Sequence, residues 1–118
     1  MKKIFLIILA TLISLLAFCQ IKISIDSVAN HYGETVMVCS KVYGTKLIAL
    51  SQTTFIYLGA EYPNSLLTVV IFSKDRSNFK DAPEVVYADK TVCVTGTLKE
   101  DNGKPEIIAS KPDDIIIQ

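Results

Sequence analysis

Thr91-Val92-Cys93-Val94-Thr95-Gly96-Thr97-Leu98 is the stretch of this 118-residue chain that does most to decide its fold. Apolar and polar side chains alternate along it with a period of two, as in a β-strand with one buried face. The valines and the leucine would point into a core, whereas Cys93 would lie on the opposite face. Residues 35–42 show the same alternation and carry Cys39 on their second face. We therefore expect the two segments to pair as neighbouring strands.

The first residues have the three-part pattern of a secretory signal peptide. A basic start, Met1-Lys2-Lys3, precedes a nearly uninterrupted apolar run over residues 4–18. Small residues, Ala17 and Cys19, stand three and one positions before the expected cleavage point after Cys19. The run is short for a membrane span, so we expect none in the mature chain. This pattern predicts a periplasmic or secreted protein with a signal peptide at 1–19 and one domain at 20–118. Two alternatives stay open, an uncleaved N-terminal anchor and a lipid at Cys19, although Phe18 is bulky for a lipoprotein signal.

The charge balance argues against a strong, sequence-independent phosphate binder. Without Lys2 and Lys3 the chain keeps ten basic and twelve acidic residues, a formal charge of about −2 with His31 neutral. Proteins that bind phosphate backbones without sequence preference are usually markedly basic. His31 is the only histidine, and a metal site needs several convergent ligands. We predict neither a metal nor a cofactor, and a surface or capping role for His31.

Export would place the two remaining cysteines in an oxidising compartment, where disulfides persist. If their strands pair as expected, Cys39 and Cys93 lie opposite each other, close enough for a bond. A bond closing the loop of residues 39–93 would stabilise the fold by about 4 kcal/mol in the chain-entropy model. The alternative is a pair of small residues that share a face without a bond.

The rest of the chain reads as short strands and turns. After the strand at 35–43, we expect further strands at residues 53–58, 66–72 and 105–110, and a last apolar piece at 115–117. We expect short helical pieces at 26–33, 74–79 and 83–87. The first helical piece would plug one end of the core. Asn102-Gly103 suits a tight hairpin. Because a chain this small best hides its strand edges by closing, we predict an all-β, five-stranded Greek-key barrel with its first and fourth strands paired.

Four groups of residues are distinctive in their order and spacing. They are 36–42 (VMVCSKV); 54–59 (TFIYLG); 62–64 (YPN) with 67–72 (LTVVIF); and 92–96 (VCVTG) followed by 103–107 (GKPEI). Over residues 26–117 the chain thus resembles the OB-fold family, and within it small exported domains grouped with nucleic-acid-binding, anticodon-binding-like domains. Two positions depart from the pattern, since Ser40 and Asp89 stand where such domains usually have glycine. Aspartate tolerates the left-handed region, whereas Ser40 predicts a less sharp bend in the first strand.

The resemblance implies a ligand face on the second and third strands, between the loops that follow the first and fourth. Carried onto this chain, the face consists of Phe55, Tyr57, Thr68, Val70 and Phe72, flanked by Lys46 and Lys104. Aromatic rings there would stack on bases, each contributing about 1–3 kcal/mol. The alternative is that the chain's own loops or termini cover these rings to complete a thin core.

These observations favour a non-enzymatic exported binding module for single-stranded nucleic acid or oligonucleotides. A module that binds an oligosaccharide or an envelope protein is a close alternative, because the domain is slightly acidic. A nuclease resembling the staphylococcal type would need acidic residues and arginines around a metal, and Arg76 is the only arginine. The run Lys74-Asp75-Arg76 is more typical of a solvated helix start than of a phosphate site.

Overall fold

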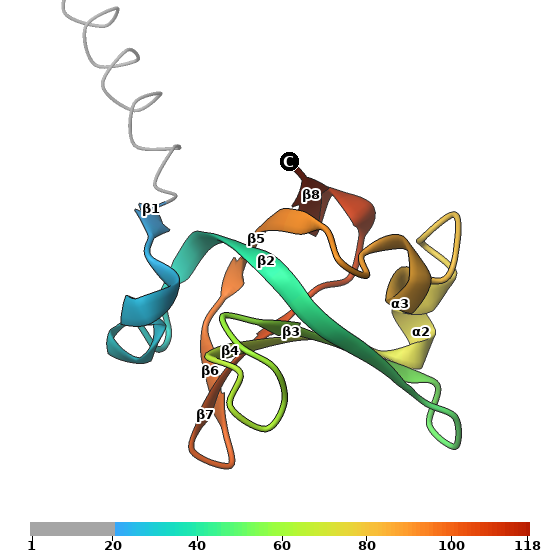
Figure 1. The fold of residues 1–118 in the computed structure, drawn as a ribbon, viewed down its shortest axis with the longest axis horizontal. Coiled ribbons are helices and arrows are strands. Elements are labelled where there is room, and N and C mark those ends of the chain that lie inside the picture. The colour runs from blue at the N-terminus through green and yellow to red at the C-terminus, as the bar shows by residue number, and fades with distance from the viewer. Residues whose placement is uncertain (1–20) are drawn as a thin grey trace, which may run out of the picture.

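The chain is mostly β-structure over residues 21–118, the part that the computed structural model describes (Figure 1). The expected signal peptide and Cys19 lie outside these residues. The eight strands are β1 (Ile21–Ile23), β2 (Thr35–Ile48), β3 (Thr53–Leu58), β4 (Leu67–Ile71), β5 (Thr91–Thr97), β6 (Lys99–Asp101), β7 (Lys104–Ile108) and β8 (Ile115–Ile117). The short helical elements are η1 (Ile25–Asn30), α2 (Ser73–Arg76), α3 (Pro83–Val86) and η2 (Pro112–Asp114). Within 21–118, every helix falls short of the length and apolar character that crossing a membrane requires.

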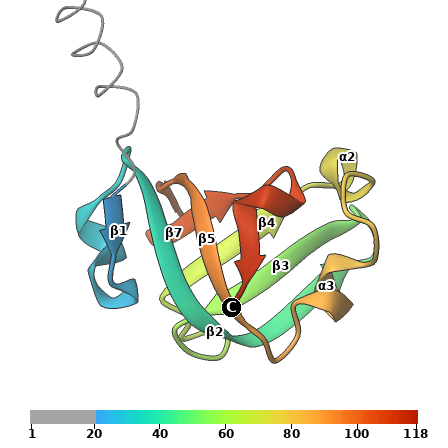
Figure 2. The same cartoon turned by 90° about the horizontal axis from the view of Figure 1, so that it is seen from above.

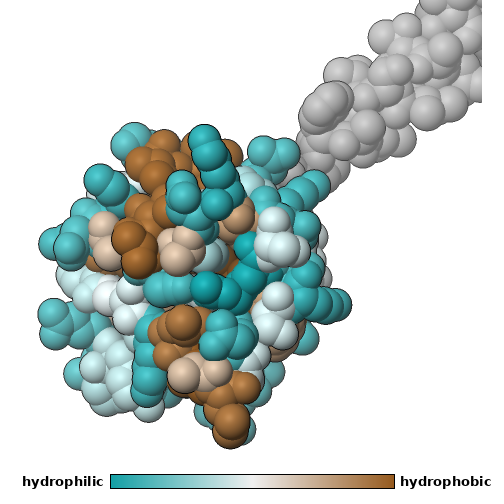
Figure 3. Space-filling view, turned by 90° about the vertical axis from the view of Figure 1, so that its right-hand side faces the viewer, coloured by the Kyte–Doolittle hydropathy of each residue, from teal (hydrophilic) through white to brown (hydrophobic). Residues whose placement is uncertain are grey.

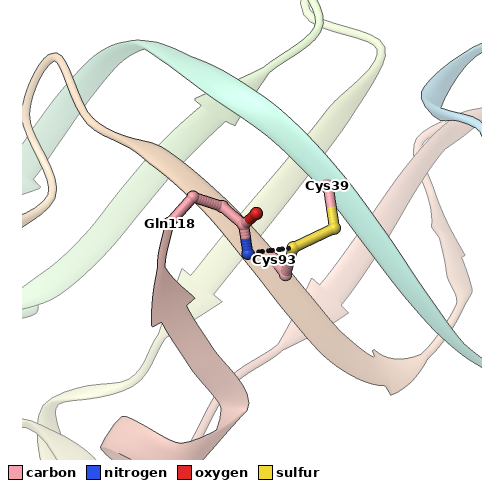
Figure 4. Close-up of a disulfide and its surroundings, with 3 residues drawn as sticks. All are labelled: Cys39, Cys93 and Gln118. Carbon is pink, nitrogen blue, oxygen red and sulfur yellow. Dashed lines mark hydrogen bonds between the residues drawn. A yellow bond between two sulfur atoms is a disulfide. The ribbon is translucent and has the colours of Figure 1, made fainter.

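The antiparallel pairing of β2 with β5 confirms the central expectation from the sequence. Val38 lies opposite Val94, and Cys39 lies directly opposite Cys93. The predicted disulfide joins these two cysteines, whose Cα atoms are 4.0 Å apart. The side-chain amide of Gln118 donates a hydrogen bond to Sγ of Cys93 over 2.9 Å, so the end of the chain packs against the disulfide (Figure 4).

Strand β2 is longer than the sequence indicated, because it continues past Tyr43 to Ile48. Its register shifts between Val42 and Gly44, which marks a β-bulge, and such a bulge bends the strand that carries it. The part before the bulge pairs with β5 and the part after it pairs with β3 (Figure 2). Ser40 supports this corner, since its hydroxyl accepts a hydrogen bond from the Gly59 amide over 3.1 Å. One bent strand therefore belongs to both halves of the fold.

The predicted closed, five-stranded barrel is wrong. The hydrogen-bonded strands run in the order β6-β7-β4-β3-β2-β5-β8, with β1 beside β2, and this order does not return to its start. The physical reason is that β8 occupies the edge of β5, pairing Ile115 with Val94. The curled sheet still brings β5 against β7. Gly96 of β5 packs so closely on Ile107 of β7 that a Cβ atom added to the glycine would lie 2.5 Å from Cγ2 of Ile107.

The turns and the helical pieces largely agree with those predicted from the sequence. Asn102 and Gly103 both have positive φ values, 51° and 79°, as the β6–β7 hairpin requires. Asp89, in the place of a glycine, also adopts a positive φ of 61°. The predicted helical pieces at 74–79 and 83–87 correspond to the shorter α2 and α3. Their side of the molecule carries separate apolar patches divided by hydrophilic residues (Figure 3).

The core fills the inside of the curl with alternate residues of every long strand. Its fully buried side chains include Val36, Val38, Val42, Ile56, Leu58, Leu67, Val69, Ile71, Val92, Val94, Leu98 and Ile107. Val28 of η1 joins this cluster, as expected for a piece that plugs one end. Phe79 and Tyr87, from the segments that follow α2 and α3, also join it and meet edge to face with ring centroids 6.3 Å apart. The opposite face of β3 and β4 points away from this core.

Candidate ligand groove

A groove of ≈ 390 Å³ lies on the outer face of β3 and β4. Its walls come from the part of β2 beyond the bulge, from the β3–β4 loop and from the β6–β7 hairpin. This is the face that the sequence predicted for a ligand. The bend in β2 forms the wall on one side of it, and the tight β6–β7 hairpin forms the wall on the other side. We call this surface the groove below.

Strand register explains which side chains share the groove. Two rows cross the sheet on its outer face: Gly44, Tyr57, Thr68 and Glu106 form one, and Lys46, Phe55, Val70 and Ile108 form the other. Gly44 leaves room for the neighbouring ring, since an added Cβ would sit 3.7 Å from Cδ2 of Tyr57. Thr68 is short, so the floor stays low between Tyr57 and Glu106.

Three aromatic rings stand next to one another in the groove. The rings of Phe55 and Tyr57 are 6.4 Å apart and nearly parallel, at 21°, and the rings of Tyr57 and Tyr62 are 5.2 Å apart at 37°. Tyr62 covers Tyr57, which is 8% exposed, whereas Tyr62 itself is 66% exposed. Burial, with a smaller effect of Tyr62, raises the pKa of the Tyr57 phenol, so it stays neutral. Phe55 and Tyr62 are therefore the rings that a ligand can reach.

Two cations and two carboxyl groups also line the groove. The ammonium group of Lys104 donates a hydrogen bond to the carbonyl oxygen of Pro63 over 2.7 Å, which ties the β6–β7 hairpin to the loop that carries Tyr62. Burial raises the pKa of the Glu106 carboxyl, and the neighbouring Asp101 raises it further by charge repulsion and a hydrogen bond, while Lys99 lowers it. With Lys46 on the other wall, the formal charges of the groove balance.

The structure brings together most of the side chains that the sequence proposed for a ligand site. Lys46, Phe55, Tyr57, Thr68 and Lys104 all line the groove. Val70 is buried at 2% exposure, and Phe72, 38% exposed, lies outside the groove as the N-cap of α2.

Sequence reasoning missed Tyr62, Asp101 and Glu106 as groove residues. Glu106 gave a usable signal, because it alternates with the buried Ile107 and so had to point outward. Tyr62 gave none beyond its position next to the Pro63-Asn64 turn, since a loop side chain has no periodicity that fixes its direction.

Other residues considered from the sequence have structural partners. The guanidinium group of Arg76 donates to both carboxylate oxygens of Glu84, over 2.8 and 2.9 Å, and to the hydroxyl of the buried Thr54. His31 caps the C-terminus of η1, and its Nδ1 lies 3.1 Å from Oε2 of Glu34. Across residues 21–118 no group of three or more metal-ligating side chains comes together.

Comparison with known proteins establishes the fold class. No family model and no curated protein sequence matches the chain. The crystal structure of yeast Stn1 and Ten1 is similar with a TM-score of 0.57 and 14% identity, over 86% of this chain and 64% of that chain. The fold is OB-like. A protein assigned as an aspartyl-tRNA synthetase from Leishmania major Friedlin is similar with a TM-score of 0.52 and 14% identity, over 81% of this chain and 20% of that chain. The OB-like chain thus spans less than two thirds of either structure.

Proposed function

We propose that the groove binds single-stranded nucleic acid or oligonucleotides and that the chain is a non-enzymatic, exported binding module. The observation that carries this proposal is the pair of accessible rings, Phe55 and Tyr62, on the outer face of an OB-like sheet with Lys46 beside them. OB-folds use this face for oligonucleotides and oligosaccharides. Aromatic rings there accept bases of any sequence, since every base has a flat π-face.

The comparisons support the same class of ligand. One of the proteins with a similar fold is assigned as an aspartyl-tRNA synthetase, and such an enzyme acts on a tRNA. The matching region is a fifth of that chain, so the likeness supports a binding domain better than it supports the enzyme's reaction. We propose binding alone, because accessible rings beside a lysine are groups that hold a ligand.

The charges of the groove predict the strength and the salt dependence of binding. Lys104 already donates to Pro63, which leaves Lys46 as the cation best placed for a phosphate. One or two phosphate contacts to a single strand would give a slope of log K against log salt of about −0.7 to −1.4. Two stacked bases would contribute about 2–6 kcal/mol in total. We expect modest affinity that depends more on the rings than on salt.

The test is a titration of the disulfide-bonded chain with a fluorescent single-stranded oligonucleotide at low and moderate salt. Phe55→Ala and Tyr62→Ala should each weaken binding by about 1–3 kcal/mol, between roughly fivefold and a hundredfold. Phe72→Ala is the matched control, because it removes an exposed ring outside the groove and should leave affinity unchanged. No binding at low salt, or an equal loss in the control, would reject the proposal.

A second candidate ligand is an oligosaccharide. Asp101 and Glu106 favour it, because carboxylates accept hydrogen bonds from sugar hydroxyls while Phe55 and Tyr62 offer flat apolar surfaces. If the oligonucleotide titration fails, binding on a glycan array that Tyr62→Ala abolishes would support this candidate. Capture of an envelope protein from an extract would address the remaining alternative.

A further inference from the structure

Two carboxyl groups face the accessible rings across the floor of the groove. Glu106 lies in register with Thr68, and Thr68 lies in register with Tyr57. The ring of Tyr62 packs against the ring of Tyr57. Since neighbouring strands are about 4.8 Å apart, the backbones of β3 and β7 are separated by roughly 10 Å at this row. Thr68 is the short side chain between them. A flat ring stacked on Phe55 or Tyr62 therefore has open space toward Glu106.

The opposite wall presents two carboxyl groups whose neighbouring cation, Lys99, lies beyond ion-pair distance. Glu106 is partly buried, and Asp101 stands beside it on the hairpin. Within residues 21–118 neither carboxylate forms an ion pair within 4 Å, since the ion pairs there are His31 with Glu34 and Arg76 with Glu84. Burial, the repulsion from Asp101 and a hydrogen bond between the two carboxyl groups raise the pKa of Glu106, while Lys99 lowers it. A hydrogen-bond donor that approaches Glu106 would favour its ionised form.

Bases differ in the donors that they can offer to such a wall. Ionised carboxylates only accept hydrogen bonds. Cytosine and adenine carry an exocyclic amino group, and aspartate or glutamate accepts from the cytosine N4 amino group in base recognition. Thymine carries a carbonyl oxygen at the same ring position, which an ionised carboxylate repels. The two pyrimidines have rings of the same size, so stacking on Phe55 or Tyr62 distinguishes them little.

We propose that Asp101 and Glu106 make the groove selective for bases with an exocyclic amino group, cytosine in particular, over thymine and uracil. The inference rests on the proposed function, because it requires that a base lies against the rings. It adds a specificity that the rings alone do not give. Asp101, at the exposed tip of the hairpin, and Glu106, nearer the floor, are the two residues that determine it.

The experiment compares oligo-dC with oligo-dT of one length and one label on the full disulfide-bonded chain. We expect oligo-dC to bind between about fivefold and a hundredfold more tightly. Glu106→Gln keeps the size of the side chain but offers a donor as well as an acceptor, so the ratio of the two affinities should fall toward one. Asp113→Asn is the control, since it removes the same charge from an exposed position on η2 and should leave the ratio unchanged.

The outcomes separate this inference from the proposed function. Equal binding of the two oligonucleotides, or a ratio that Glu106→Gln leaves unchanged, would overturn the selectivity and leave the binding function standing. Failure of both oligonucleotides to bind would overturn both. Any uniform gain in affinity on loss of a negative charge affects both oligonucleotides alike, so the ratio is independent of it. A melting curve for each variant establishes that it is folded.

Discussion

Replacing Gly96 by alanine tests the close approach of β5 to β7 that keeps the sheet curled. The added Cβ would lie 2.5 Å from Cγ2 of Ile107, whereas carbon atoms prefer 3.5–4.0 Å, so the overlap is about 1 Å. Ile107 is fully buried and β-branched, so its χ1 angle has few alternatives. Because Gly96 does not adopt a left-handed conformation, the cost is steric. We expect Gly96→Ala to lower the free energy of unfolding by about 1–3 kcal/mol.

A double-mutant cycle isolates this contact. Ile107→Ala alone should cost about 2–5 kcal/mol, the usual range for truncating a buried isoleucine. In that background Cγ2 is gone, so adding Gly96→Ala should cost nothing or stabilise the protein by up to about 1 kcal/mol. The assay is urea unfolding of the disulfide-bonded protein, read from the midpoint at constant m. Additive losses would refute the contact, because independent sites add and touching ones do not.

Three further predictions concern the disulfide, the groove and the ion pair. Replacing Cys39 and Cys93 together by alanine should lower the free energy of unfolding by about 4 kcal/mol in urea, and a loss below about 1 kcal/mol would contradict the chain-entropy account. Folding raises the pKa of Glu106, so the wild type loses stability as pH rises from the ordinary glutamate pKa through the raised one. Glu106→Gln should therefore melt at a higher temperature than the wild type at pH 7, but not at a pH well below the ordinary glutamate pKa. The reverse order of melting temperatures would count against the partly buried carboxyl. Arg76→Met should destabilise by about 1–3 kcal/mol by leaving Glu84, 14% exposed, without its partner, and adding Glu84→Gln should recover part of this loss in the same urea assay.

The strands of the core were predictable because their side chains alternate. Val92 and Val94 had to face one way, so Cys93 had to face the other. The same parity around Cys39 predicted the pairing and placed the two cysteines opposite each other, where the structure joins them. The tight hairpin at Asn102-Gly103 was predictable for a local reason, since both residues tolerate positive φ.

The departures arise from long-range pairing that no local pattern encodes. Gly44 looked like the end of a strand, but in the structure it follows a bulge that lets β2 continue along β3. The last apolar piece, residues 115–117, was expected without a pairing partner, yet β8 takes the edge of β5 and keeps the hydrogen-bonded order open. Tyr62 enters the groove because Lys104 holds its loop at Pro63, a contact between segments far apart in the chain.

Mapping of backbone amide chemical shifts tests the central claim most directly, with isotope-labelled, disulfide-bonded protein titrated with a single-stranded oligonucleotide. Binding in the groove predicts saturable shifts at Lys46, Phe55, Tyr62 and Glu106, while the amides around the disulfide at Cys93 stay in place. Shifts absent from these four residues, or confined to the side of the sheet that carries the disulfide, would contradict the account.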